Sequence, residues 1–350
     1  MTREQRMVLL LPAVVLSAAL PAQAQRLTEP LFPADVDMWV NRANIEFRVY
    51  KNQAAIYEFG RGLAKPYFWP LQAPNHKQVT RSWPMLAAPS GGSTDSPHHK
   101  SAWFGFGDVI PEGLSLKRKV KGVEGVDFWT ETSNSGRIVC VSVRNDKTDQ
   151  NHAYVTTRNE WRTADGDKIL DETRKIQFIN YETARLFVLD IDLYASVAPI
   201  VFGDTREGAM AVRVADSIRE DRGKGRITNA EGKVGEKNCW GRVSPWCDYS
   251  GPVEDQIVGI ALFAGPDNPH PSAWNCRASG LMAANPFGRE KSGFSAMKGK
   301  TERVRIDKGK HLKLRYGLFV HLGDAKQGKV AENYERFAKL PKDGARAARP

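Results

Sequence analysis

The stretch Leu312-Lys-Leu-Arg-Tyr-Gly-Leu-Phe-Val-His-Leu322 places an apolar residue at every second position. Successive side chains of a β-strand point to opposite faces, so this spacing predicts a long strand with one buried face. Similar runs, rich in β-branched and aromatic residues, recur between Gly, Pro, Asn and Asp along the chain. They lie at residues 45–49, 139–143, 154–161, 173–181, 186–194, 210–214 and 257–263. Many strands without alternating helices predict an all-β fold and disfavour a Rossmann or TIM-barrel fold.

One helix is expected near the C-terminus, where the side chain of Asp324 can cap its first turn. Val330, Tyr334 and Phe337 are spaced so that they share one helical face, and this spacing continues up to Leu340. The helix is therefore expected to pack that apolar face against the β-rich part of the chain.

The chain of 350 residues contains no internal repeat and no Pro/Gly-rich linker that would divide it. We expect one large antiparallel β-sandwich over residues 25–340, with the single C-terminal helix included. A mutarotase-like supersandwich is one form of such a fold. Residues 341–350 are expected to form a loose tail.

Residues 1–24 have the organisation of a secretory signal peptide. Arg3 and Arg6 precede a short apolar run at residues 7–20, and Ala22-Gln-Ala24 supplies the small residues of a cleavage site. Cleavage after Ala24 would make the mature protein periplasmic or secreted; an uncleaved anchor helix is the alternative. No later apolar run reaches about 18 residues, so no membrane span is expected after the signal.

Four cysteines are the next feature that an export signal helps to interpret. An oxidising compartment would allow disulfides, and four thiols can pair in three ways. Buried free thiols are the alternative, because a chain of this length can form a core without disulfides. The four are Cys140, Cys239, Cys247 and Cys276, and their pairing stays open.

The formal net charge of +11 limits the partners that we expect. The positive residues are dispersed and form no dense Lys/Arg block, a pattern typical of the solvent faces of strands. An exported protein is not expected to bind nucleic acid. An acidic polysaccharide remains a candidate ligand.

The segment Asp95-Ser-Pro-His98-His99 carries the strongest candidates for chemistry, because it leads from a Gly/Ser/Pro-rich loop into an apolar run that includes Trp103. Imidazole can accept or donate a proton near neutral pH, or bind a metal ion. His98 and His99 are therefore candidate catalytic residues. The alternative is one surface histidine and one packed histidine.

Three later segments combine aromatic rings with charged or amide side chains. Flat rings suit the C–H faces of a sugar, and polar groups bind its hydroxyls. Asp204, Glu231 and Asp248 are the candidate carboxylates for acid/base work. The expected substrate-binding residues, with those of the earlier segments, are Lys65, Arg81, Trp103, Arg206, Trp240, Arg242, Trp246, Tyr249, His270 and Asn285. A buried aromatic core with paired charges, a solvated turn at Asp204 and an ordinary loop position for His270 are the alternatives.

Ten short motifs follow one another in a distinctive order. They are Lys65-Pro-Tyr-Phe-Trp-Pro-Leu71, Val79-Thr-Arg81, Asp95-x-Pro-His-His99, Trp103-Phe-x-x-Gly-Asp108, Val126-Asp-Phe-Trp129, Phe202-Gly-Asp-Thr205, Asn229-x-Glu-Gly232, Trp246-x-Asp-Tyr-Ser-Gly251, Gly259-Ile-Ala and Ala284-Asn-Pro-Phe-Gly288. This order resembles a bacterial family of unknown function that is often labelled "methane oxygenase PmoA". The resemblance implies an exported, β-rich protein associated with carbohydrate metabolism, including keto-sugars. Ser96 and Gly265 stand where the family has histidines.

Three functions follow from these features. The first is a carbohydrate enzyme that works by proton transfer, in hydrolysis, elimination or epimerisation, with His98 or His99 as acid or base. The second is a glycan-binding module without catalysis, in a groove lined by Trp240 and Trp246. The third is the metal-dependent oxygenase of the label, with a metal bound through His98 and His99. No cofactor is otherwise expected.

Overall fold

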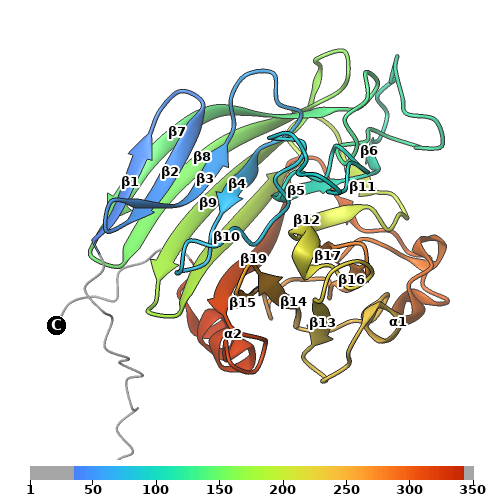
Figure 1. Ribbon diagram of the computed structural model, residues 1–350. Helices are drawn as coiled ribbons and strands as arrows, with labels where there is room; N and C mark the ends of the chain where they lie inside the picture. Colours follow the sequence, from blue (N-terminus) through green and yellow to red (C-terminus); the bar gives the residue numbers. More distant parts are fainter. Residues whose placement is uncertain (1–34, 343–350) are drawn as a thin grey trace, which may run out of the picture. The chain divides into compact units, whose positions relative to one another are not determined.

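The computed structural model describes residues 35–342, so the predicted signal peptide and most of the expected tail lie outside the described residues. Two eight-stranded antiparallel sheets stack on each other, and a small three-stranded sheet lies at one end (Figure 1). The prediction of an antiparallel β-sandwich with a C-terminal helix is confirmed.

The first sheet contains, in spatial order, β1 (Val36–Val40), β2 (Asn44–Val49), β3 (Asn52–Glu58), β4 (Tyr67–Leu71), β5 (Ala102–Phe106), β12 (Gly208–Arg213), β17 (Leu281–Asn285) and β16 (Ala273–Cys276). The second contains β13 (Arg226–Asn229), β14 (Trp246–Val253), β15 (Gln256–Ala264), β19 (His311–Leu322), β10 (Ala184–Tyr194), β9 (Lys168–Asn180), β8 (His152–Arg162) and β7 (Arg137–Thr148). The third contains β18 (Arg305–Ile306), β11 (Ile200–Phe202) and β6 (Val109–Pro111). The helical elements are α1 (Glu236–Cys239), α2 (Val330–Lys339) and the short 3-10 turns Asp216–Ile218, Glu290–Ser292 and Ser295–Met297.

The main core lies between the two large sheets. Phe47 of β2 and Phe178 of β9 have ring centroids 5.6 Å apart, and Phe68 of β4 lies 5.2 Å from Phe187 of β10. Each of these rings is at most 1% exposed. Full burial of one such side chain contributes about 1.5–3 kcal/mol, so these contacts hold the sheets together.

The strand that the alternating stretch predicts is β19, which pairs with β15 on one side and β10 on the other. Leu314 and Leu318 point into the main core, as the period of two predicts. Phe319 points the other way and is also buried, because α2 covers that face of the second sheet. This strand is therefore buried on both faces.

Helix α2 packs Val330, Tyr334 and Phe337 against the second sheet, which confirms the predicted apolar face. The expected cap is wrong. Lys329 occupies the N-cap position of α2, and the Asp324 carboxylate accepts backbone N–H bonds within the preceding turn instead.

The four cysteines are free thiols, and Cys239, Cys247 and Cys276 are buried in the main core. In the part of the chain that the structure describes, no helix is long and apolar enough to cross a membrane.

Candidate functional site

The outer face of the first sheet carries an aromatic cluster that is separate from the main core. Register places Tyr67, Trp103, Ala211, Ala283 and Asn275 opposite one another across β4, β5, β12, β17 and β16. All but Asn275 belong to this aromatic cluster, which also contains Trp129. Alternation along the strands therefore gives this sheet two apolar faces, one of which is built around tryptophan.

His99 packs into this cluster. Its ring stacks on Trp103 at 5.2 Å and meets Trp129 edge-on at 5.7 Å. The His98 ring lies edge-on to His99 at 4.4 Å and stays partly exposed. We define these four residues, His98, His99, Trp103 and Trp129, as the histidine–tryptophan face.

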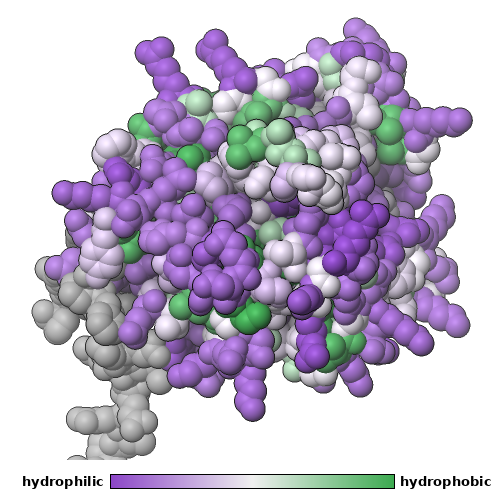
Figure 2. All heavy atoms as spheres, viewed as in Figure 1, coloured by the Kyte–Doolittle hydropathy of each residue, from purple (hydrophilic) through white to green (hydrophobic). Residues whose placement is uncertain are grey.

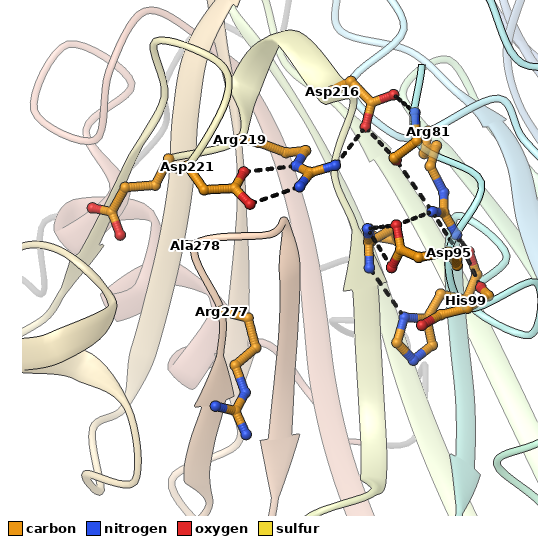
Figure 3. Close-up of polar contacts among 12 residues, drawn as sticks. Arg81, Asp95, His99, Asp216, Arg219, Asp221, Arg277 and Ala278 are labelled. Atoms are coloured by element: carbon orange, nitrogen blue, oxygen red, sulfur yellow. Dashed lines mark hydrogen bonds and ion pairs between the residues drawn. The ribbon is translucent and has the colours of Figure 1, made fainter. Parts of the chain in front are cut away.

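The backbone around the two histidines adopts uncommon conformations. Ser96 has φ 48° and Ser101 has φ 53°, both in the left-handed region that costs a non-glycine residue about 1 kcal/mol or more. The loop is held by Arg81, whose guanidinium donates to the carbonyl oxygens of Asp95, Ser96 and His99 at 2.9, 3.0 and 3.3 Å (Figure 3). Strained backbone held by a buried arginine is typical of functional loops.

A second arginine determines the state of the His99 ring. Arg213 donates through Nη1 to Nδ1 of His99 at 3.3 Å, and through Nη2 to both oxygens of Asp95 at 2.8 and 2.9 Å. Because guanidinium has only donors, Nδ1 must accept, and the neutral ring carries its proton on Nε2. The Asp95–Arg213–His99 chain thus selects one tautomer.

Both histidines are neutral at physiological pH. Burial, then the proximity of His98 and Arg213, lowers the pKa of His99 to about 2. Burial, then the positive charge of Lys65, lowers the pKa of His98 to about 4. His98 is therefore a proton acceptor, whereas His99 is a permanent hydrogen-bond donor.

Two lysines and a carboxylate lie beside this face. Lys65, 1% exposed, donates to the backbone oxygen of Trp129 at 2.8 Å and to Glu131 at 3.0 Å. Lys100 binds the other oxygen of Glu131. Burial opposes ionisation of Glu131, but the two lysines outweigh it and hold the pKa of Glu131 below its usual value.

The pKa of the Glu207 carboxyl group is shifted in the opposite direction to that of Glu131. Glu207 is partly buried beside β5, where a Cβ on Gly107 would lie 2.9 Å from its own Cβ. Burial raises the pKa of Glu207, although Arg206 and Arg277 oppose the shift. Asp127 influences both Glu207 and His98 electrostatically. Burial thus makes the Glu207 carboxyl group harder to ionise than an exposed glutamate.

Three buried N–H donors of the histidine–tryptophan face have no acceptor among the described residues. They are Nε2 of His99 and the indole Nε1 atoms of Trp103 and Trp129. Their residues are 6%, 1% and 1% exposed. Buried donors without partners are uncommon and costly in folded proteins, so this concentration points to acceptors supplied by a ligand.

Of the predicted site residues, the structure brings together Lys65, Arg81, His98, His99 and Trp103. Arg206 and Trp240 both contact β16, which belongs to the same sheet as β5. The backbone oxygen of Arg206 accepts from Asn275, and Trp240 donates to Asn275. These two residues lie at the edge of the first sheet, where β16 is the last strand.

Trp246 and Asp248 are corrected by the structure. Trp246 packs with the α2 cluster, and Asp248 is fully buried and bound to Nε2 of His321 at 2.8 Å. Both side chains point to the outer face of the second sheet. The two sheets and the main core therefore separate them from the histidines, and the shared pocket expected for these residues does not form.

Three other predicted residues hold backbone in place. Asp204 accepts the backbone N–H groups of Arg289, Lys291 and Ser292. Asn285 donates to the backbone oxygen of Thr205 and accepts from the backbone N–H groups of Phe287 and Gly288. The buried Tyr249 hydroxyl binds Glu220, Arg277 and Ala278. Their polar groups are occupied by loop anchoring rather than turned towards the histidines.

The remaining candidates lie apart from this network. Glu231 and Arg242 are exposed, with Glu231 at a turn before Gly232. His270 is half-buried, and burial and Arg289 lower its pKa. No contact connects these three side chains to the histidine–tryptophan face among the described residues.

Sequence reasoning missed Lys100, Trp129, Glu131, Glu207 and Arg213 as site residues. A charged residue inside an apolar strand run was the available signal for Arg213, since it is 1% exposed within β12. Trp129 ends the Val126-Asp-Phe-Trp129 motif, and Glu131 comes two residues after it. Their approach to Lys65 depends on long-range packing that no local pattern encodes.

The chain belongs to a family of unknown function, DUF6807, whose family model matches residues 44–335. No curated protein matches it in sequence. The solved structures that it resembles include a galactose 1-epimerase from Lactobacillus acidophilus NCFM, 8% identical, with a TM-score of 0.39 and coverage of 83% of this chain and 99% of the epimerase. A galactose mutarotase-like protein from Clostridium acetobutylicum is 8% identical, with a TM-score of 0.36 and coverage of 82% and 95%. A glycoside hydrolase family 97 enzyme from Pseudoalteromonas sp. strain K8 is 11% identical, with a TM-score of 0.39; the match covers 76% of this chain but only 34% of that enzyme.

Proposed function

We propose that this member of the DUF6807 family is an exported protein that binds a carbohydrate on the histidine–tryptophan face and acts on it by proton transfer. The observation that carries the proposal is the set of three buried N–H donors without acceptors on His99, Trp103 and Trp129. Sugar hydroxyl and ring oxygens can accept such bonds, while indole rings pack against sugar C–H groups.

The acid and base roles are assigned from two environments. One lowers the pKa of His98, and the other raises the pKa of Glu207. The lowered pKa of His98, about 4, keeps its imidazole in the proton-accepting form at neutral pH. The raised pKa of Glu207 favours its proton-donating form. A neutral base and a carboxyl group with a raised pKa suit hydrolysis, elimination beside a keto group, or epimerisation.

His99 has a different role in this proposal. Its ring stays neutral because its pKa is about 2, and Arg213 holds its proton on Nε2. A neutral imidazole N–H can donate to a substrate oxygen whose negative charge grows during proton abstraction. His99 therefore stabilises the developing charge while His98 removes the proton.

The metal-dependent oxygenase suggested by the family label fits these residues poorly. Nδ1 of His99 already accepts from Arg213, and the cations of Lys65 and Arg81 lie close enough to lower its pKa. Within residues 35–342, no group of three His, Cys, Asp or Glu side chains is placed to hold a metal ion. We derive no step through a metal.

A glycan-binding module remains the second candidate, because the unpartnered donors serve binding equally well. Its expected groove between Trp240 and Trp246 does not form, since Trp246 packs beside α2. The face shown in Figure 2 is mainly hydrophilic, and its apolar residues lie in small, separate patches. This surface suits a polar ligand better than a broad protein contact.

A product screen tests the proposal. The protein is incubated with glycosides and their 3-keto derivatives, with and without chelator, and products are identified by mass spectrometry. We expect a chelator-resistant product that His98→Ala abolishes. The matched control is His311→Ala, an exposed histidine on the second sheet that binds Asp192. Binding without any product would select the binding module, and loss of turnover with chelator would overturn the metal-free mechanism.

A further inference from the structure

A small pocket of 110 Å³ opens beside the histidine–tryptophan face. Its polar lining comes from Lys100, Glu131, Thr132, Ser135 and Arg137. Lys100 also lies over the ring of Tyr67, a member of the aromatic cluster, with its Nζ 5.7 Å from the ring centroid. Lys100 therefore links the pocket to the aromatic cluster, and the pocket is large enough for one small polar group.

Positive charge exceeds negative charge around this pocket. Lys65, Lys100 and Arg137 supply three cations, and Glu131 is the carboxylate that both lysines bind. Arg137 donates to the backbone oxygen of Gly62 at 2.9 Å, which orients its guanidinium without neutralising it. Among the lining residues, Lys100 and Arg137 face the single carboxylate of Glu131, so one positive charge is left without a matching carboxylate.

Because Lys65 is buried, the excess of positive charge at the pocket destabilises the protein when no ligand is bound. Lys65 is 1% exposed, and burial lowers its pKa although Glu131 opposes the shift. A buried cation is stabilised by any further anion that comes within a few ångströms. The pocket therefore gains more from an anionic group than from a hydroxyl of the same size.

A second charged cluster lies on the other side of the loop that carries the histidines. Arg81 and Arg213 share the single carboxylate of Asp95. Both arginines contact His99, through its backbone oxygen and its Nδ1 atom. Asp216 also acts on both arginines, and Arg219 pairs with Asp216 and Asp221, so this cluster is balanced in charge and the excess of cations lies at the pocket.

We propose that the carbohydrate handled at this site is acidic, and that its carboxylate or sulfate group lies in the pocket beside Lys100 and Arg137. This inference rests on the proposed function and names its substrate class. Thr132 and Ser135 supply hydroxyl groups to the same pocket and bond to each other, while the Glu131 carboxylate binds both lysines.

Calorimetric titration tests the inference with three probes of equal length: an oligogalacturonate, its carboxyl-reduced neutral form, and a sulfated galactan. We expect an anionic probe to bind at least about tenfold more tightly than the neutral one at low salt, and we expect this preference to shrink as salt screens the charges. The oligogalacturonate and the sulfated probe distinguish a carboxylate from a sulfate.

Two variants locate the effect. Lys100→Met and Arg137→Gln should each weaken binding of the anionic probe more than binding of the neutral probe. Lys308→Met and Arg158→Gln, both exposed and outside the site, are matched controls that should bind like the wild type. Thermal melting checks that every variant folds.

The outcomes separate the two proposals. Equal affinity for anionic and neutral probes, or an equal loss of both in the variants, would overturn the acidic substrate and leave the carbohydrate site intact. Failure of all three probes to bind would overturn the acidic substrate together with the proposed function.

Discussion

Arg213 donates to Nδ1 of His99 across 114 residues of sequence, and this bond sets which nitrogen of the ring carries the proton. The two residues sit on β12 and on the loop before β5, strands that pair directly. Asp95 holds the other end of the guanidinium. A positioning network of this kind can be tested without changing either histidine.

Arg213→Met should release the His99 ring from its tautomer. Without the donor at Nδ1, the ring can carry its proton on either nitrogen, and turnover should fall by about tenfold or more. Nitrogen NMR of labelled histidine measures the tautomer directly. A variant that keeps the Nε2–H form with reduced turnover would contradict the positioning role, because the loss would then have another cause.

His98→Gln should remove proton abstraction while preserving the shape of the site. We expect turnover to drop by about 10²- to 10⁴-fold. In the wild type, kcat/KM should stay constant from neutral pH down to about pH 5 and then fall through about pH 4, where His98 becomes protonated. A pH–rate profile measures this limb, and a limb centred near the ordinary histidine pKa would argue against His98 as the base.

Glu207→Gln should separate binding from turnover. Glutamine keeps the size and polarity of the side chain but cannot supply a proton. Because burial raises the pKa of Glu207, its protonated form persists to a higher pH than that of an exposed glutamate. We expect unchanged affinity by calorimetry and lost turnover. Full activity in this variant would exclude Glu207 as the acid.

The neutral state of His99 should make stability depend on pH. Its pKa is lowered from 6.5 to about 2, so below pH 6.5 the unfolded chain binds a proton that the folded protein does not. The free energy of unfolding should therefore decrease as pH falls from 6.5 towards 4. Urea unfolding across this range should show a shallower slope for His99→Gln. An identical slope in both proteins would mean that His99 is protonated in the fold.

Arg174→Met should destabilise the sandwich itself. Arg174 of β9 donates to Glu172 at 2.6 Å and, across the core, to the hydroxyl of Tyr57 on β3 at 2.8 Å. Both charged side chains are at most 1% exposed. Removal of one partner leaves a buried charge and should cost roughly 3–5 kcal/mol of unfolding free energy. Arg305→Met breaks a half-exposed pair with Glu112 and should cost less than about 1 kcal/mol. Similar losses in these two variants would contradict the structural role of burial.

Local pattern accounts for much of this fold. The period of two at residues 312–322 predicted β19, and the helical spacing of Val330, Tyr334 and Phe337 predicted α2. These signals succeed because side-chain direction along one strand or one helix depends only on backbone geometry within a few residues. The histidine segment also stood out locally, since its residue types carry their chemistry with them.

The position of a side chain relative to distant strands and helices could be determined only from the tertiary structure. Trp246 and Asp248 have the composition of a sugar site, yet they face α2 and His321, because the covering of each sheet face depends on how distant strands stack. Arg213 is a charged residue within the apolar strand β12, and its bond to Nδ1 sets the tautomer of His99. Residue type and strand period were thus determined by the amino-acid sequence alone, because they depend on local geometry. The partners of each buried polar group depended on long-range packing, where a side chain takes its role from whichever element lies opposite it.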